Sequence, residues 1–98
     1  MDKKKDGRYS FTAPLLRGEG AGAWHFVEFP HDVEQEFGTR GQVRVKALIN
    51  GIAVDRALIP TRSGIHVLIL GGDIRKAANI TDPLRPVEVT LWKDPDPD

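Results

Sequence analysis

The sequence predicts a mainly β protein, a small closed six-stranded barrel with two short helices. Three observations support this. Alternating apolar runs flank an Asn-Gly pair at Asn50–Gly51, an almost unbroken apolar run occupies 65–70, and further alternating segments cover 9–15 and 87–92. Alternation with a period of two is typical of half-buried strands. Six such strands in about 85 residues are enough to close a small barrel and remove its exposed edges.

The first two predicted strands lie on either side of a glycine-rich turn. Every second residue of 9–15 is apolar, and the glycines at 18, 20 and 22 then indicate a mobile turn. Residues 24–29 hold three of the seven aromatic side chains and form the second strand. Pro30 ends it, because proline has no backbone N–H to donate to a neighbouring strand.

A short helix is predicted over 31–38, followed by a hairpin. The helix has acidic residues in its first turn, Val33 and Phe37 four residues apart, and Gly38 as its expected cap. In the hairpin, 42–60, Asn50 and Gly51 both tolerate the positive φ angles of a type I′ turn.

The remaining elements are a buried strand, a second short helix and a final strand. The run 65–70 is apolar on both faces, so we expect it to be buried on both, in a barrel or under a helix. Residues 71–79 indicate a helix with Asp73 near its start and Asn79 in the left-handed position after its end. The last strand covers 87–92.

Length and composition predict a single domain over 8–92, with flexible charged tails at 1–7 and 93–98. The chain has no cysteine, which excludes disulfides, thiolate nucleophiles and cysteine-based zinc sites. It also lacks a signal-peptide pattern and any long apolar run, so we expect a cytoplasmic location without membrane contact.

Charge is balanced in total but unevenly distributed. Acidic and basic residues both number 14, which argues against the strongly basic surface typical of nucleic-acid-binding domains. Residues 19–36 nevertheless hold five acids and no Lys or Arg, whereas 40–76 hold seven Lys and Arg against two acids. Either folding interleaves these segments, or the basic segment forms a face that binds an anion or an acidic partner.

The order of these features resembles a bacterial family, the domain of unknown function numbered 1905. The resemblance rests on residues spread over nearly the whole domain: Phe11, Ala13, Trp24, Phe29-Pro30, Gly41, Val43, Val45, Ile49-Asn50-Gly51, Ile59-Pro60, Gly64, His66 and Arg75-Lys76-Ala77. It implies a closed barrel similar to double-psi and cradle-type barrels, without an established activity. Relatives often continue into a YdeI-type second domain associated with bacteriocin protection, so we expect a stand-alone member without that role.

Several kinds of catalytic or ligand chemistry find little support. No G-x-S-x-G elbow exists, and Ser63 with His66 three residues later is explained equally well by turn chemistry. The three histidines match no metal-binding spacing. Gly71-Gly72 precedes a helix but lacks the P-loop and dinucleotide patterns. We therefore expect no catalytic residues, no metal and no cofactor.

A group of basic residues is the strongest binding candidate. Arg56, Arg62, His66 and Arg75 would meet at one end of the barrel if the chain returns as predicted, and Trp24 could line its mouth. Arginine suits bidentate binding of carboxylate or phosphate. The alternative is that these are surface arginines whose stems cover apolar strands, and that Trp24 only packs.

The function expected from these residues is a non-enzymatic binding or interaction module. Its partner would be an anionic small molecule or an acidic protein segment, and the domain would be a monomer or a weak homodimer. Two alternatives stay open: a nucleic-acid-binding barrel like those of some transcription regulators, and an unrecognised enzyme.

Overall fold

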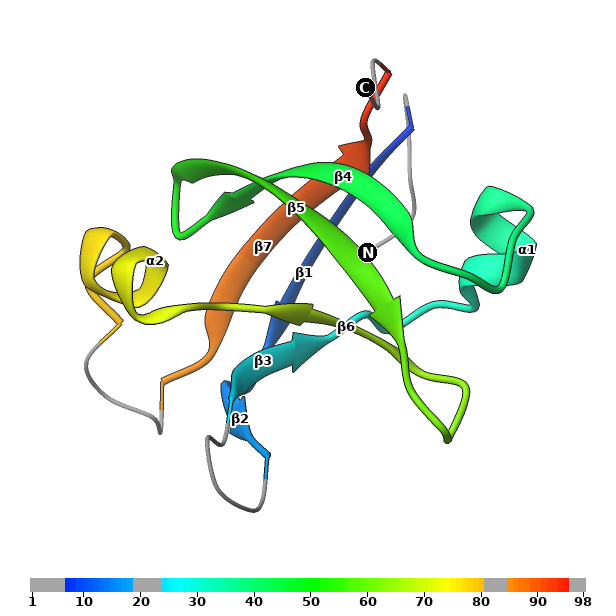
Figure 1. The fold of residues 1–98 in the computed structure, drawn as a ribbon. Coiled ribbons are helices and arrows are strands. Elements are labelled where there is room, and N and C mark those ends of the chain that lie inside the picture. Colours follow the sequence, from blue (N-terminus) through cyan, green and yellow to red (C-terminus); the bar gives the residue numbers. More distant parts are fainter. Residues whose placement is uncertain (1–6, 19–23, 81–84, 96–98) are drawn as a thin grey trace.

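A single curled sheet of seven antiparallel strands forms most of the molecule (Figure 1). The computed structural model describes residues 7–18, 24–80 and 85–95. The strands lie side by side in the order β1-β7-β4-β5-β6-β3-β2. The elements are β1 (Arg8–Ala13), β2 (Leu16–Arg17), β3 (His25–Glu28), α1 (Val33–Phe37), β4 (Val43–Ile49), β5 (Ile52–Pro60), β6 (His66–Ile69), α2 (Gly72–Ala77) and β7 (Val87–Lys93). The prediction of a mainly β fold with two short helices is confirmed.

The predicted hairpin is the longest strand pair of the sheet. β4 and β5 pair from Val43 opposite Leu58 to Ile49 opposite Ile52. Asn50 and Gly51 turn the chain with φ angles of 48° and 88°, as a type I′ turn requires. This prediction is confirmed, and the reason is local, because these two residue types adopt positive φ at little cost.

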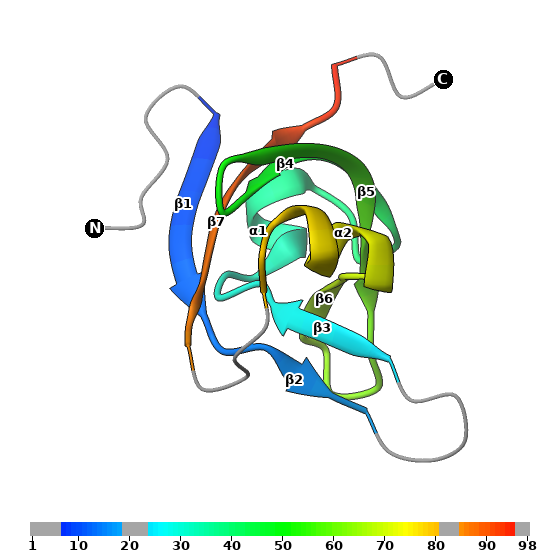
Figure 2. The same cartoon turned by 90° about the vertical axis from the view of Figure 1, so that its left-hand side faces the viewer.

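The prediction of a closed six-stranded barrel is wrong, because the sheet is open and has seven strands. The first predicted strand, 9–15, ends at Ala13, and after Pro14 and Leu15 the chain continues as β2 at the opposite edge of the sheet. β1 pairs only with β7, and β2 pairs only with β3. Figure 2 shows the chain leaving β1 and crossing below the sheet into β2. Pro14 cannot donate a backbone hydrogen bond, so the chain changes its pairing partner there and leaves a seam.

The core lies on the inner, concave face of the curled sheet. Along β4 the inner residues are buried and the outer ones are not, and β1 and β7 alternate in the same way. Residues of both helices complete this core: Val33 of α1, and Ile74 with Ala78 at α2. The helices therefore close the open ends of the curled sheet, α1 at one end and α2 at the other (Figure 1).

Both helices agree with the sequence. Asp32 caps α1 by accepting bonds from the N–H groups of Glu34 and Gln35, and Gly38 ends it at φ 79°. Asn79 takes the left-handed conformation expected after α2, with φ 59°. At the start of α2, Gly71 is the N-cap, and Asp73 lies in the first turn as expected. Neither helix has the length or apolar character needed to span a membrane, among the residues described.

The apolar run 65–70 is buried on the inner side and only partly on the outer side. His66, Leu68 and Leu70 face inward and are buried, whereas on the outer side Val67 is buried, Ile69 is half-buried and Ile65 is 42% exposed. The buried residues of both helices belong to the inner core. In the sheet, β6 lies between β3 and β5.

Parts of the predicted tails and of the glycine-rich turn, and the segment before the last strand, lie outside the described residues. This applies to 1–6, 96–98, the glycines at 20 and 22, and the segment 81–84. At the C-terminal end, β7 continues through Lys93, and the N–H of Asp94 donates to the carbonyl of Arg44 at 3.0 Å.

Candidate anion-binding site

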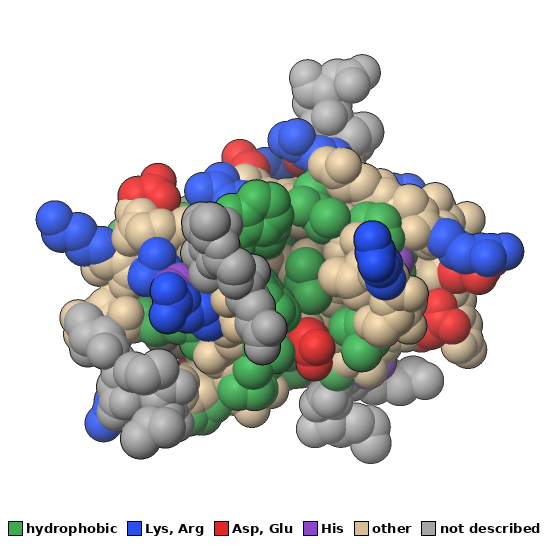
Figure 3. Space-filling view, turned by 60° about the horizontal axis from the view of Figure 1, so that its bottom comes forward, with side chains coloured by type: hydrophobic (Ala, Val, Ile, Leu, Met, Phe, Trp, Pro, Cys, Tyr) green, Lys and Arg blue, Asp and Glu red, His purple; other side chains and the backbone are tan. Residues whose placement is uncertain are grey.

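Three basic side chains come together at the end of the sheet closed by α2. Arg17 of β2 lies directly opposite His25 of β3 in the antiparallel register, so their side chains project from the same face. Arg75 reaches this pair from α2, and both guanidinium groups act electrostatically on the His25 ring. We call Arg17, His25 and Arg75 the basic cluster. Figure 3 shows blue side chains gathered around a purple histidine at the end that carries α2.

Backbone contacts hold the cluster in place. The N–H of Leu70 donates to the carbonyl of His25 at 2.9 Å, which ties the end of β6 to the start of β3. The carbonyl of Leu70 in turn accepts from Nε of Arg75 at 3.1 Å. Leu70 therefore contacts both the backbone of His25 and the side chain of Arg75. Arg75 uses Nε for this bond, and its terminal nitrogens, which form no hydrogen bond within the described residues, can bind another group.

The electrostatics of the cluster favour an added anion. Burial, then the positive charges of Arg75 and Arg17, lower the pKa of His25 below its usual value. Within the described residues neither arginine forms an ion pair; the pairs found are Arg40 with Glu34 and Lys46 with Asp55. Asp73 lies near Arg75 in sequence, but its carboxylate accepts from the N–H of Ile74. Two unneutralised guanidinium groups and a histidine thus share one end of the molecule.

Trp24 lies beside the cluster in the chain and is the most exposed large apolar side chain of the described residues, at 64%. Its carbonyl accepts from the N–H of Gly18 at 2.8 Å, which extends the pairing of β2 with β3 by one step. The indole therefore offers an exposed apolar face in the segment that leads into the cluster. Such a pairing suits a ligand with both an anionic group and an aromatic or apolar part.

The family comparison can now be set beside this geometry. Residues 11–91 match the family described as domain of unknown function (DUF1905). The chain belongs to the DUF1905 family. No curated protein matches it. Family membership therefore confirms the resemblance seen in the sequence and assigns no activity, so the chemistry must be argued from the residues themselves.

The structure of this DUF1905 domain separates the basic residues that the sequence grouped together. Arg62 lies in the turn before β6 and Arg75 in the helix after it, so the length of that strand lies between them. Arg56 is in the middle of β5 and donates from Nη1 to the carbonyl of Asp55 at 2.7 Å. Of the predicted binding residues, only Arg75 and Trp24 belong to the α2 end described above.

His66 is a packed histidine at the opposite end. It is 4% exposed, and its Nε2 donates to the carbonyl of Gly41 at 2.9 Å. Its Nδ1 is buried without a partner in the described part of the chain. A ligand in solution cannot reach this buried ring without rearrangement. No group of three His, Asp or Glu side chains gathers as a metal site would need, within the described segments.

Arg17 and His25 are the two cluster residues that sequence reasoning missed. They flank the glycine-rich segment on both sides, since Arg17 precedes Gly18 and His25 follows Trp24. Two apolar segments joined by a glycine-rich connection are typical of a hairpin, and a hairpin would have placed the two residues opposite each other. The signal was therefore present, although the connection is longer than the two-residue turn that marks β4 and β5.

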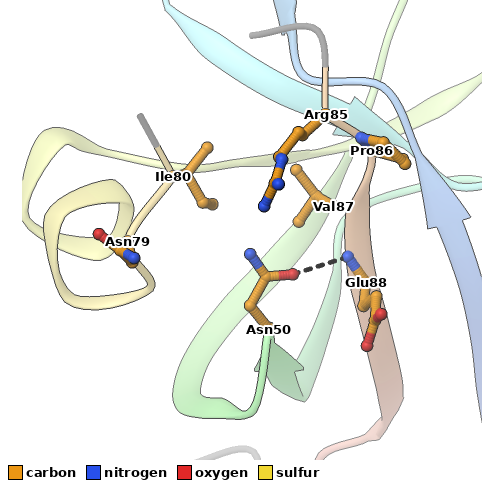
Figure 4. A pocket seen from close by; sticks show the side chains of 7 residues that line it. All are labelled: Asn50, Asn79, Ile80, Arg85, Pro86, Val87 and Glu88. Atoms are coloured by element: carbon orange, nitrogen blue, oxygen red, sulfur yellow. Dashed lines mark hydrogen bonds between the residues drawn. The ribbon is translucent and has the colours of Figure 1, made fainter. Parts of the chain in front are cut away.

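A polar pocket of about 510 Å³ also lies at the α2 end of the DUF1905 domain (Figure 4). The guanidinium group of Arg85 points toward Asn50. The Asn50 side chain accepts from the N–H of Glu88 at 2.9 Å and donates to the carbonyl of Ala78 at 3.4 Å. Asn50 therefore joins the hairpin to β7 and α2. The side-chain hydrogen bonds in this pocket hold these elements together.

Proposed function

We propose that this DUF1905 domain is a non-enzymatic binding module for an anionic ligand, held by Arg17, His25 and Arg75. The observation that carries the proposal is the convergence of two arginines without an ion-pair partner, among the residues described, on a histidine whose pKa they lower. A bound carboxylate, sulfate or phosphate group would relieve the repulsion among the three cations.

Support for a binding role also comes from the exposed Trp24 beside the cluster. An indole face and a guanidinium pair together fit a small molecule with an anionic group and a flat apolar part. An acidic protein segment with an aromatic residue would meet the same groups. The proposal covers both partners, because the chemistry that recognises them is shared.

The test is a titration of the ¹⁵N-labelled protein with sodium sulfate, with sodium chloride at equal ionic strength as reference. Sulfate keeps its charge between pH 5 and 8, so only the protein titrates. We expect saturable shifts at the amides of His25, Leu70 and Arg75. Replacing Arg17 or Arg75 by alanine should weaken binding about tenfold, in line with the loss of one charged hydrogen-bonded contact.

Arg62→Ala is the matched control, because Arg62 is exposed and lies at the other end of β6. It should leave sulfate binding unchanged. Equal losses in Arg62→Ala and Arg17→Ala, or shifts that never saturate, would show only a general ionic effect and would refute the site. A thermal-shift screen of anionic metabolites, compared between the unmodified domain and Arg17→Ala, would then identify the ligand.

A further inference from the structure

The seam between the two edges of the curled sheet contains a groove of about 540 Å³. We call it the seam groove. Its lining comes from three segments: Phe11, Thr12, Ala13, Pro14 and Leu16; Glu28, Phe29, Pro30, His31 and Asp32; and Ser63, Gly64 and Ile65. Consecutive residues of a strand point to opposite faces, so a groove that touches 11–14 in succession runs along the edge of β1. It shares no residue with the basic cluster.

Both strands beside the groove have a free edge. β1 pairs with β7 on one side only, and within the described residues no strand pairs with its other side. β3 pairs with β6 through Phe26, Val27 and Glu28, while β2 pairs only with His25 and Phe26 on the opposite side. Backbone N–H and C=O groups along such edges are a template for an added strand.

The side chains around the groove select for a particular partner. Phe11, Phe29 and Ile65 make its walls apolar, while Glu28 and Asp32 add two carboxylates. No Lys or Arg lines it among the described residues; exposed Arg62 lies in the adjoining turn, outside the lining. Figure 3 shows apolar side chains across the middle of this face with a red acidic side chain among them. The charge is therefore complementary to a basic group.

The two carboxylates differ in the hydrogen bonds that they already accept. Oδ1 of Asp32 accepts from two N–H groups at the start of α1, at 3.0 and 3.3 Å. Glu28 is exposed, and its side chain has no hydrogen bond or ion pair within the described segments. Glu28 is thus free to bind a cation, and Asp32 adds negative charge beside it.

We propose that the seam groove binds an extended, mainly apolar peptide segment with a lysine or arginine, which adds as a strand between β1 and β3. Main-chain hydrogen bonds to β1 supply affinity, the apolar walls take alternate side chains, and Glu28 takes the cation. Three or four residues would span about 10 to 13 Å of the edge at the usual strand rise. The guest strand would complete the barrel that this chain leaves open.

The probe is the acetylated and amidated peptide Val-Lys-Val-Lys-Val, titrated into the ¹⁵N-labelled full chain. We expect shifts at the amides of residues 11–13 and 27–31, and slower hydrogen exchange at the β1 amides that face the seam. Two matched peptides act as references. Val-Glu-Val-Glu-Val reverses the charge, and Val-Lys-Pro-Lys-Val removes one main-chain donor and cannot continue a ladder. Both should bind about tenfold more weakly, or not at all.

Variants of two exposed isoleucines distinguish peptide binding in the groove from binding elsewhere on the surface. Ile65→Arg places a long cationic side chain in the groove and should abolish binding of the lysine peptide. Ile52→Arg makes the same change at a residue of similar exposure outside the groove, 36% against 42%, and should bind normally. The double variant Glu28→Gln with Asp32→Asn should bind about fivefold to tenfold more weakly, because asparagine still caps α1 while both charges are lost.

Two outcomes would overturn the proposal. One is the absence of peptide-dependent shifts along β1 at millimolar peptide, or shifts that Ile65→Arg leaves intact. The other is sedimentation of the peptide-free protein as a dimer that Ile65→Arg dissociates, since a second copy would then be the occupant. Sulfate binding at the basic cluster is measured separately, so failure here leaves the proposed function untouched.

Discussion

The two ends of the curled sheet are closed by helices of similar length but with different chemistry. At the α1 end, the rings of Tyr9, Phe29 and Phe37 pack within 6.0 Å of one another, and Tyr9 donates to Glu36 at 3.0 Å. At the α2 end, Arg17, His25 and Arg75 meet without a carboxylate partner among the described residues. One end buries its aromatic rings, whereas the other keeps cations together at a cost in repulsion.

The difference is consistent with the proposed division, in which the α1 end stabilises the fold and the α2 end binds the anion. Asp32 and Gly38 cap α1 at both ends, but Gly71 offers α2 no side-chain cap. Proteins tend to depart from local stability rules where a ligand supplies the missing interaction. Substitutions at the α1 end should therefore mainly change stability, and substitutions at the α2 end should mainly change binding.

The largest effect should come from Phe29→Ala. Phe29 is 3% exposed and its ring contacts four others, so its removal leaves a cavity in the aromatic packing. We expect the free energy of unfolding to fall by about 3 to 5 kcal/mol. Trp24→Ala is the matched control on the same segment and should change it by less than about 0.5 kcal/mol. Urea denaturation measures both, and equal losses would contradict the assignment of the α1 end as the stabilising one.

The second effect concerns alkaline pH at the α1 end. Burial, then the hydrogen bond to Glu36 and its negative charge, raise the pKa of Tyr9 from 10.0 to about 12. Between these values the unfolded chain loses the phenolic proton while the folded chain keeps it, so stability falls as pH rises. The loss over this interval should be about 2 to 3 kcal/mol. Urea midpoints at pH 9 and 11 should show about half of this loss, and Tyr9→Phe should lose less stability over the same range; identical slopes would contradict it.

A smaller effect is expected where the hairpin meets the α2 end. Asn50→Gly keeps the positive φ of the turn but removes the side-chain bonds to Glu88 and Ala78. These bonds are partly exposed, so the free energy of unfolding should fall by about 0.5 to 1.5 kcal/mol. Thermal unfolding measures the change. Asn50→Asp retains an acceptor for the N–H of Glu88 and should lose less; a larger loss would indicate that the acceptor is unimportant.

Sequence reasoning succeeded where short-range chemistry decides the structure. Asn50 and Gly51 specify their turn alone, and Asp32 with Gly38 specify the ends of α1. Closure of the barrel is a long-range property. Closure depends on whether the chain keeps the same partner strand on both sides of Pro14 or changes to another. The apolar residues alternate in the same way whichever partner is chosen. The period of two indicates a strand but not its neighbours.

The candidate site shows the same limit. Arg62 and Arg75 are both basic and both close to β6 in sequence, but the strand between them carries them to opposite ends. Arg17 and His25 are brought together by strand register, which the sequence indicates only through the glycines between them. His66 was grouped with the arginines on its chemistry, whereas its inward position in β6 decides its role. Site residues are therefore predictable once strand partners are known.

The smallest effect, and the one that most directly compares the two ends, is the response of His25 to acid. Its pKa in the folded chain lies below the ordinary value of 6.5, so the folded chain binds fewer protons than the unfolded chain as pH falls through 6.5. Stability is therefore fully present above that pH and decreases below it, the opposite direction to Tyr9. Thermal unfolding at pH 8 and 5 should show the decrease, and His25→Gln should reduce it. Sulfate should also reduce it, because a bound anion favours the protonated ring, and by linkage sulfate should bind more tightly at pH 5 than at pH 8. If His25→Gln kept the full pH dependence of sulfate binding, the histidine would have to be removed from the site and the two arginines left to hold the anion alone.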